Sequence, residues 1–231
     1  MSSPLKGSSV LLLGATGGIG LALAIELLGR GAELCCVAKD SQKLDALEVE
    51  AYKFVADLRT PKACEDSIKF ALDSMSKIDV IINATGVVAF GEVVDLSIDA
   101  MEELFLVNVF IPIMFGKLAL DHLEDNGTIV NISGIIAEKN MPGMAAYGAS
   151  KAALKSFDEA FAREARRKGV RVLDARPPHT ESGLVDHPIE GTAPKMPTGM
   201  STNKVATIIC DAMENGSKDL PSEGFYSSAC N

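Results

Sequence analysis

The chain has 231 residues, of which 47% are hydrophobic and 23% charged, and its formal net charge is −9. A chain of this length can bury a sizeable core, and α/β chains of this size often form a single domain. The acidic balance argues against a nucleic-acid surface, which needs clustered excess lysine and arginine. No apolar stretch reaches the roughly 20 residues that span a bilayer. Residues 1–7 (MSSPLKG) lack the apolar segment of a signal peptide, so we expect a cytoplasmic protein without a membrane anchor.

Cysteine and histidine residues indicate no metal or redox chemistry. The five cysteines are an odd number without a Cys-x-x-Cys pair, which is typical of buried, reduced thiols. His179 and His187 lie near Glu181 and Asp186, but no recognisable ligand spacing links them. The sequence therefore predicts no metal site.

The first two predicted elements are a strand and a helix joined by glycines. The apolar run over residues 10–13 indicates a fully buried strand, and a helix is predicted over about 19–28. The turn between them carries Gly14, Gly17, Gly18 and Gly20. Backbone N–H groups and the helix dipole favour a pyrophosphate at such a turn. The setting predicts a nucleotide site, with an ordinary tight turn as the alternative.

Strands and helices alternate along the rest of the chain. Strands are predicted over residues 33–37, 52–55, 80–83, 128–132 and 170–173, and helices over 41–49, 61–75, 101–122 and 145–168. Repeated βα units with buried strands indicate an α/β, doubly wound parallel sheet of the Rossmann type with right-handed crossovers. We expect one domain over residues 1–231.

Tyr147 and Lys151 share one face of the helix predicted over residues 145–168, because they lie four residues apart. A tyrosine hydroxyl titrates near pH ~10, so it exchanges protons at neutral pH only beside a positive charge. Lys151 can be that charge. A solvated lysine one turn from a tyrosine is the alternative interpretation.

Several motifs, taken together, resemble the short-chain dehydrogenase/reductase family. Residues 14–20 (GATGGIG) are similar to the family's Gly-x-x-x-Gly-x-Gly, and residues 83–86 (NATG) to its Asn-Asn-Ala-Gly. Tyr147 and Lys151 match the catalytic Tyr-x-x-x-Lys, Asn108 the helical asparagine, and Asp57 the acidic residue at the adenine ring. The resemblance runs from about residue 8 to residue 226.

The resemblance implies hydride transfer between a nicotinamide and an alcohol or carbonyl substrate. Tyr147 would exchange the proton at the reacting oxygen, Lys151 would hold the nicotinamide ribose and lower the phenol pKa, and Asn108 would support a water on the proton path. For Asn108, a purely structural role in tying a buried helix to its neighbour stays open. The expected cofactor-binding residues are Gly14, Thr16, Gly18, Ile19, Gly20, Lys39, Asp57, Leu58, Asn83, Ala84, Gly86, Lys151, Pro177, Thr180 and Ser182.

One family position departs from the pattern. Counting back from Tyr147 without a gap, the family's catalytic serine falls on Gly134, and Ser133 lies one residue earlier. Losing such a donor can cost on the order of 100-fold in rate. Ser133 is a candidate catalytic residue only if the strand end bends, because adjacent strand residues point opposite ways. The departure motivates a second hypothesis, a cofactor-binding sensor or interaction protein of the same fold with impaired catalysis.

The end of the second strand bears on the choice of cofactor. An NAD enzyme usually has an acidic residue where Ala38 stands, which binds the ribose diol and repels a 2′-phosphate. Lys39 follows and offers a cation to that phosphate, so NADP(H) is favoured over NAD(H). Asp40, and the lack of a basic residue at Gly17 or Gly18, count against this preference.

The resemblance also places a substrate loop, with small lid helices, at about residues 183–200, and a short C-terminal tail at 221–231. The apolar residues of this loop suit a small or medium, mostly apolar carbonyl. Helices 101–122 and 145–168 carry more apolar residues than one sheet face covers, and family relatives pair these helices, so we expect a homodimer or homotetramer. These residues are Phe105, Val109, Met114, Leu118, Leu154, Phe157 and Phe161.

Overall fold

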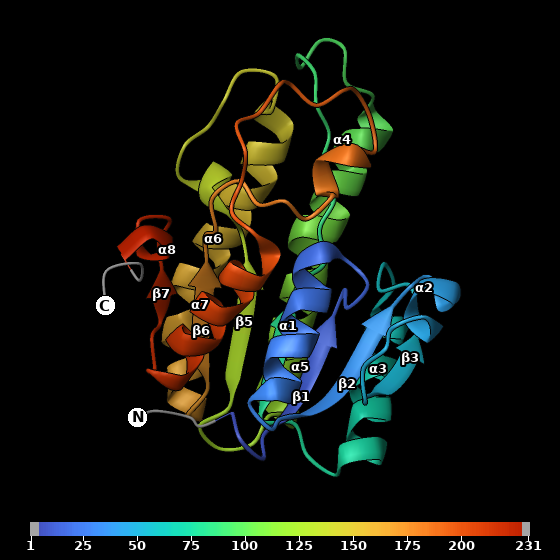
Figure 1. The fold of residues 1–231 in the computed structure, drawn as a ribbon, viewed down its shortest axis with the longest axis vertical. Coiled ribbons are helices and arrows are strands. Elements are labelled where there is room, and N and C mark those ends of the chain that lie inside the picture. Colours follow the sequence, from blue (N-terminus) through green and yellow to red (C-terminus); the bar gives the residue numbers. More distant parts are fainter. Residues whose placement is uncertain (1–4, 228–231) are drawn as a thin grey trace.

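The computed structural model describes residues 5–227 and has the predicted α/β architecture (Figure 1). Seven parallel strands form one sheet in the order β3-β2-β1-β4-β5-β6-β7. The strands are β1 Ser9–Leu13, β2 Glu33–Ala38, β3 Tyr52–Val55, β4 Val80–Asn83, β5 Thr128–Ile132, β6 Arg171–Ala175 and β7 Asp219–Leu220. The strand order reverses between β1 and β4, and ligands of such sheets bind beyond the carboxyl ends of the strands at this point.

Helices cover both faces of the sheet. They are α1 Gly18–Gly29, α2 Ser41–Asp45, α3 Pro61–Met75, α4 Ile98–Phe105, α5 Ile111–His122, α6 Ala145–Ala165, α7 Thr202–Glu214 and α8 Gly224–Ser227. Side-chain caps begin several of them: Thr60 accepts from the backbone N–H of Ala63 at α3, and Ser201 accepts from that of Lys204 at α7. Pro61 occupies the first position of α3, where its missing N–H costs nothing.

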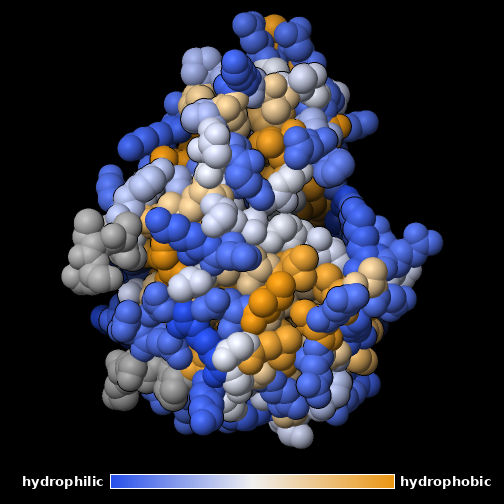
Figure 2. All heavy atoms as spheres, viewed as in Figure 1, coloured by the Kyte–Doolittle hydropathy of each residue, from blue (hydrophilic) through white to orange (hydrophobic). Residues whose placement is uncertain are grey.

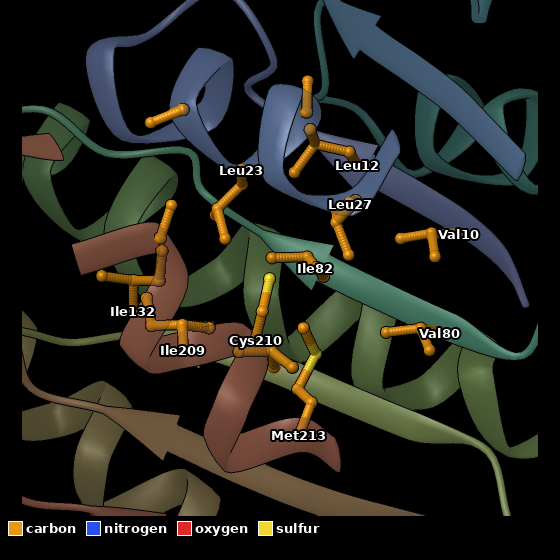
Figure 3. Close-up of a cluster of buried hydrophobic side chains, with 14 of the residues drawn as sticks. Val10, Leu12, Leu23, Leu27, Val80, Ile82, Ile132, Ile209, Cys210 and Met213 are labelled. Carbon is orange, nitrogen blue, oxygen red and sulfur yellow. The ribbon is translucent and has the colours of Figure 1, made fainter. Parts of the chain in front are cut away.

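Residues of β1 feed two separate core layers because successive strand side chains point to opposite faces. Val10 and Leu12 pack under α1 and α7, as Figure 3 shows for Leu12, Leu23 and Met213. Leu11 and Leu13 lie in the opposite layer under α3, α5 and α6. Burial on both faces explains why the strand is a continuous apolar run.

The predicted helix over residues 101–122 starts earlier and is not uniform. Ser97 caps α4 through the N–H of Ala100, and a π-helical turn, Leu106–Phe110, separates α4 from α5. The whole segment Ile98–His122 is long and apolar enough to cross a membrane by length and composition alone. It contacts α3 and α6, and its Phe115 is 1% exposed, as in the core helix of a globular protein.

Three elements near the C-terminus were not predicted, namely α7, β7 and α8. Phe225, within the expected tail, is fully buried against the α1–α7 core layer, whereas its neighbour Tyr226 is 60% exposed. The helix predicted over 41–49 ends at Asp45. Residues 1–4 and 228–231 lie outside the described residues. They include part of the start, residues 1–7, and part of the expected tail, 221–231. The four cysteines in the described part are buried and unpaired, as predicted.

Candidate active site

A cavity of about 670 Å³ opens beyond the carboxyl ends of the central strands. Most of the predicted site residues line it: Gly14, Thr16, Gly18, Ile19, Lys39, Asp57, Leu58, Ala84, Gly86, Ser133, Tyr147, Lys151, Pro177, Thr180 and Ser182. Gly20, Asn83 and Asn108 do not line it. The sheet topology therefore brings together the glycine-rich turn and the Tyr–Lys pair, which are far apart in the sequence.

The glycine-rich turn has the form of an anion cradle. Gly14 has φ +76°, and a Cβ there would lie 2.8 Å from the carbonyl oxygen of Ala84. A Cβ on Gly18 would lie 2.3 Å from the oxygen of Ser182, and one on Gly20 would lie 2.2 Å from that of Gly14. Helix α1 starts without a side-chain cap and without an acidic residue in its first turn. Its first N–H groups are therefore available to an anion, and the turn fits a dinucleotide pyrophosphate.

Asn83 and Asn108 stabilise the loops around the cavity. The Asn83 side-chain oxygen accepts from the backbone N–H and the hydroxyl of Thr85, which fixes the turn after β4. Asn108, in the π-helical turn, accepts from the N–H of Val87 at 3.0 Å and donates to its carbonyl at 2.9 Å. It also donates to the Ser150 hydroxyl at 3.0 Å. The Asn108 side chain thus ties the π-helical turn to the β4 loop and to α6.

Tyr147 and Lys151 lie on the side of α6 that faces the cavity. Lys151 is 5% exposed, and its ammonium donates to the carbonyl of Ile132 at 2.8 Å. Burial lowers the pKa of Lys151 to about 8, and the nearby carboxylates Asp174 and Asp158 oppose that shift. Burial raises the pKa of Tyr147 to about 12. In the protein alone, therefore, the phenol keeps its proton at neutral pH, and the amine lies close to its titration point.

The strand end after β5 carries the departure from the family pattern. Gly134 has φ +86° and ψ 164°, so the chain turns there in a conformation that L-residues avoid. Ser133 lines the cavity, but its hydroxyl donates to Asp174, and its side chain is 1% exposed. Neither residue presents a free hydroxyl in the way that the family serine would.

Three cationic side chains line the cavity near the ends of β2 and β3, and the sequence predicted only one of them. Lys39 was predicted, and Lys43 and Arg59 line the same cavity. Arg59 pairs with Asp57 at 2.7 Å and with Glu103. Lys43 follows Lys39 by four residues, and this spacing was the available signal.

The carboxylate of Asp40, beside Lys39, is engaged in capping a helix. It accepts from the backbone N–H of Lys43 at the start of α2, at 3.0 Å. Asp40 is not among the cavity-lining residues. Because the Asp40 carboxylate is bound to the start of α2, it is a weaker argument against a 2′-phosphate beside Lys39.

The end of the cavity beyond Tyr147 is apolar. Ile136, Met144, Leu184, Val185 and Met196 line it and belong to one hydrophobic cluster. From the predicted substrate loop, Val185, His187 and Met196 contribute, whereas Ile189 is 37% exposed and Met200 packs under α7. In place of the expected small lid helices, the segment 183–200 contains one short 3-10 turn, Leu184–Asp186.

Comparisons with known proteins agree with this geometry. Hydroxynaphthalene reductase arp2 of Aspergillus fumigatus is 28% identical over 189 residues, covering 78% of this chain and 69% of the relative. Dehydrogenase/reductase SDR family member 4 of Caenorhabditis elegans is 28% identical over 226 residues, covering 93% and 79%.

A solved structure and a family profile extend the comparison. The fold is similar to that of a short chain dehydrogenase from Burkholderia cenocepacia in complex with NADP, with a TM-score of 0.83 and 24% identity over 96% of this chain and 98% of that one. The profile of the short chain dehydrogenase family matches residues 8–191, which include the glycine-rich turn, Tyr147 and Lys151. The chain is therefore a member of the short-chain dehydrogenase/reductase family, whose members are oxidoreductases.

Proposed function

We propose that the protein is an NADP(H)-dependent alcohol dehydrogenase or carbonyl reductase. The observation that carries this proposal is the placement of Tyr147 and Lys151 in the same cavity as the glycine-rich turn. A dinucleotide whose pyrophosphate lies at the start of α1 would extend along this cavity toward Tyr147. The first test is oxidation of NADPH by the purified protein with a panel of apolar ketones and aldehydes.

The residues of the chain would handle the proton in this reaction. The bound nicotinamide would supply or accept the hydride at the substrate carbon. Tyr147 would give its proton to the oxygen on which negative charge develops, or take it in the reverse direction. Lys151 would bind the ribose hydroxyls and stabilise the phenolate electrostatically. The Asn108 side chain would hold the π-helical turn beside Lys151, because it is fully engaged with Val87 and Ser150.

The cavity wall also supports a substrate class. Its apolar lining would accept the carbon skeleton of a small or medium, mostly apolar carbonyl compound. Among the described residues that line the cavity, the lysine and arginine side chains are Lys39, Lys43, Arg59 and Lys151, so a phosphate or coenzyme A ester would find no further lysine or arginine at the apolar end.

The preference for NADP(H) rests on the cations at the ribose end. Lys39→Ala is expected to weaken NADPH binding by about 1 kcal/mol, or about 5-fold in Kd, while leaving NADH binding unchanged, because only NADPH carries the 2′-phosphate. Fluorescence titration of both cofactors measures this difference. Lys62→Ala serves as a control, since that side chain is 75% exposed on α3 and does not line the cavity. Equal losses for both cofactors in Lys39→Ala would show that Lys39 does not face the 2′ position.

A cofactor-binding protein without catalysis is the second candidate. It is favoured by Gly134, and by the engagement of the Ser133 hydroxyl with Asp174. Such a protein would bind NADPH with normal affinity and turn over no carbonyl compound. Binding and turnover measured on the same preparation separate the two candidates.

We also propose a cytoplasmic homo-oligomer that pairs α4, α5 and α6. The seven apolar residues that suggested this pairing are buried or partly buried by the chain itself. Two other apolar side chains in this region are exposed: Ile98 on α4, at 66%, and Phe110 in the π-helical turn, at 55%. A second apolar surface lies over α1 (Figure 2), where Ile25 is 56% exposed. Light scattering is expected to give a multiple of 24.4 kDa for the wild type and for Ile25→Asp, and a smaller assembly for Phe110→Asp. A monomeric wild type would contradict the proposal.

A further inference from the structure

A second, smaller cavity lies between α6 and the strands β6 and β7 at the edge of the sheet. Its volume is about 220 Å³, and four carboxyl groups line it, those of Asp158, Glu159, Asp174 and Asp219. The side chains of Glu159 and Asp219 are each 62% exposed, so this cavity opens to solvent. Asp158 and Asp174 are 3% and 5% exposed and form its inner wall. Two buried carboxyl groups are therefore within reach of water on the side of β6 away from the active site.

Asp174 is held by two partners. Arg176, itself 4% exposed, forms an ion pair with its second oxygen, and the same guanidinium also pairs with Glu138 and Asp219. The first oxygen of Asp174 accepts the hydroxyl proton of Ser133. Both residues of this hydrogen bond are buried. Ser133 lines the catalytic cavity and Asp174 lines the second one, so this single hydrogen bond crosses the wall between the two.

Asp158 is incompletely paired as a carboxylate. Its Oδ1 accepts from the Asn131 amide at 2.6 Å, whereas its Oδ2 and the Asn131 Oδ1 have no hydrogen-bond partner. If Asp158 Oδ2 carried a proton, its O–H group could donate to Asn131 Oδ1. One proton would then give both atoms a hydrogen-bond partner. Burial and the neighbouring Asp174 raise the pKa of Asp158 well above its usual value, against the opposing effects of Arg176 and Lys151. The unpaired oxygens and the direction of this shift both favour the protonated form of Asp158.

The chain of polar groups reaches the catalytic pair. Lys151 donates to the carbonyl of Ile132, the residue immediately before Ser133. Asp158 lies seven residues after Lys151 on α6, which is close to two helical turns, so both side chains lie on the face that packs on the sheet. We propose that Asp158, Asp174 and Ser133 form a proton route that joins the second cavity, which opens to solvent, to the catalytic cavity. This inference rests on the proposed oxidoreductase function.

The route would restore the proton of Tyr147 after each reduction. Tyr147 gives its hydroxyl proton to the substrate oxygen and becomes a phenolate. The Ser133 O–H bond breaks as that proton moves to the phenolate, directly or through water in the catalytic cavity. In the same step, Ser133 Oγ takes a proton from Asp174 Oδ1. Asp174, a carboxylate in the resting protein because it accepts from Ser133 and pairs with Arg176, receives that proton from Asp158 through water in the second cavity, and Asp158 recovers one from solvent. One proton enters from solvent per turnover, and in the oxidation direction one leaves.

Ser133→Ala tests the route with the smallest change. Its steady-state rate is expected to fall several-fold at low buffer concentration and to recover when a small proton carrier such as imidazole is added. The rate of a single turnover, which starts from protonated Tyr147, should fall much less. The matched control is Ser222→Ala, because Ser222 is also buried and bonds to Glu138 in the same network but lines neither cavity. Equal falls in the two rates of Ser133→Ala, without rescue, would overturn the route.

A measurement on the cofactor-free protein tests the proton store separately. Infrared spectra at neutral pH should contain a carboxylic-acid carbonyl band that shifts in D2O and disappears in Asp158→Asn. Absence of that band overturns the route, whatever the enzymatic activity. A wild type that shows the band but turns over no carbonyl compound contradicts the proposed function instead. If turnover occurs and Asp158→Asn matches the wild-type steady-state rate at low buffer, Asp158 is not on the route and the proposal fails.

Discussion

Replacing Tyr147 by phenylalanine is expected to lower turnover by about 10²- to 10⁴-fold, the usual contribution of a positioned general acid or base. The affinity for NADPH should stay within a few-fold of the wild-type value, because the substitution removes one hydroxyl and keeps the ring packed beside Ile136 and Met144. Steady-state kinetics with any accepted ketone, together with cofactor titration, measure the two effects.

Tyr226→Phe is the matched control for this experiment. It makes the same chemical change on a side chain that is 60% exposed, on α8 and outside the cavity lining. Its kinetics should equal those of the wild type. If Tyr147→Phe keeps the wild-type rate, Tyr147 does not carry the proton and the proposed mechanism is wrong.

The sequence was sufficient for the sheet because its central strands are buried on both faces. The predicted bounds of β4, β5 and α3 agree with the structure, since buried, mostly apolar strands and a capped amphipathic helix define them. The bounds of β3 agree as well, although this edge strand includes Lys53 and has exposed ends. The elements after residue 200 were missed for the opposite reason. Strand β7 has only two residues, and α8 has four, so neither carries a measurable period. Helix α7 differs, because its 13 residues follow the cap Ser201 and were a usable signal that the sequence prediction did not take up.

The cavity-lining residues were predictable where a short motif specifies them. The glycine-rich turn, Tyr147 and Lys151 lie where the spacing placed them, in one cavity. Arg59 was missed because a cation near a strand end has no distinguishing neighbours in the sequence. For Lys43, in α2, the four-residue spacing from Lys39 was the only signal, and alone it is weak. Their relevance follows only from the tertiary structure, which brings them to the same end of the cavity as Lys39.

The surroundings of Ser133 show the limit of motif reasoning most clearly. A strand-end serine next to a missing catalytic serine invites the interpretation that it substitutes. The structure instead pairs its hydroxyl with Asp174, which is 41 residues later in the sequence and lies on the neighbouring strand. No local pattern links these residues, because the register of β5 against β6 creates the contact.

Gly134→Ser is expected to destabilise the protein by about 1–3 kcal/mol rather than restore a catalytic hydroxyl. The reason is backbone conformation and not space. Gly134 has φ +86° and ψ 164°, a region that is essentially restricted to glycine, whereas the nearest atom to an added Cβ is the oxygen of Pro177 at 3.9 Å. To relieve the strain, the β5 end would have to move, and with it the N–H of Ile135 that donates to Pro177 at 2.9 Å.

Denaturant unfolding of Gly134→Ser and of a matched variant, Gly29→Ser, measures this cost. Gly29 ends α1 without a positive φ, and an added Cβ there meets nothing within 4 Å, so its free energy of unfolding should change by less than about 0.5 kcal/mol. Because Pro177 lines the cavity that we propose binds NADPH, we also expect Gly134→Ser to bind NADPH more weakly. An unchanged stability combined with faster ketone reduction would show that the β5 end accepts a serine. In that case, Gly134 would be a lost catalytic hydroxyl and not a structural requirement of this turn.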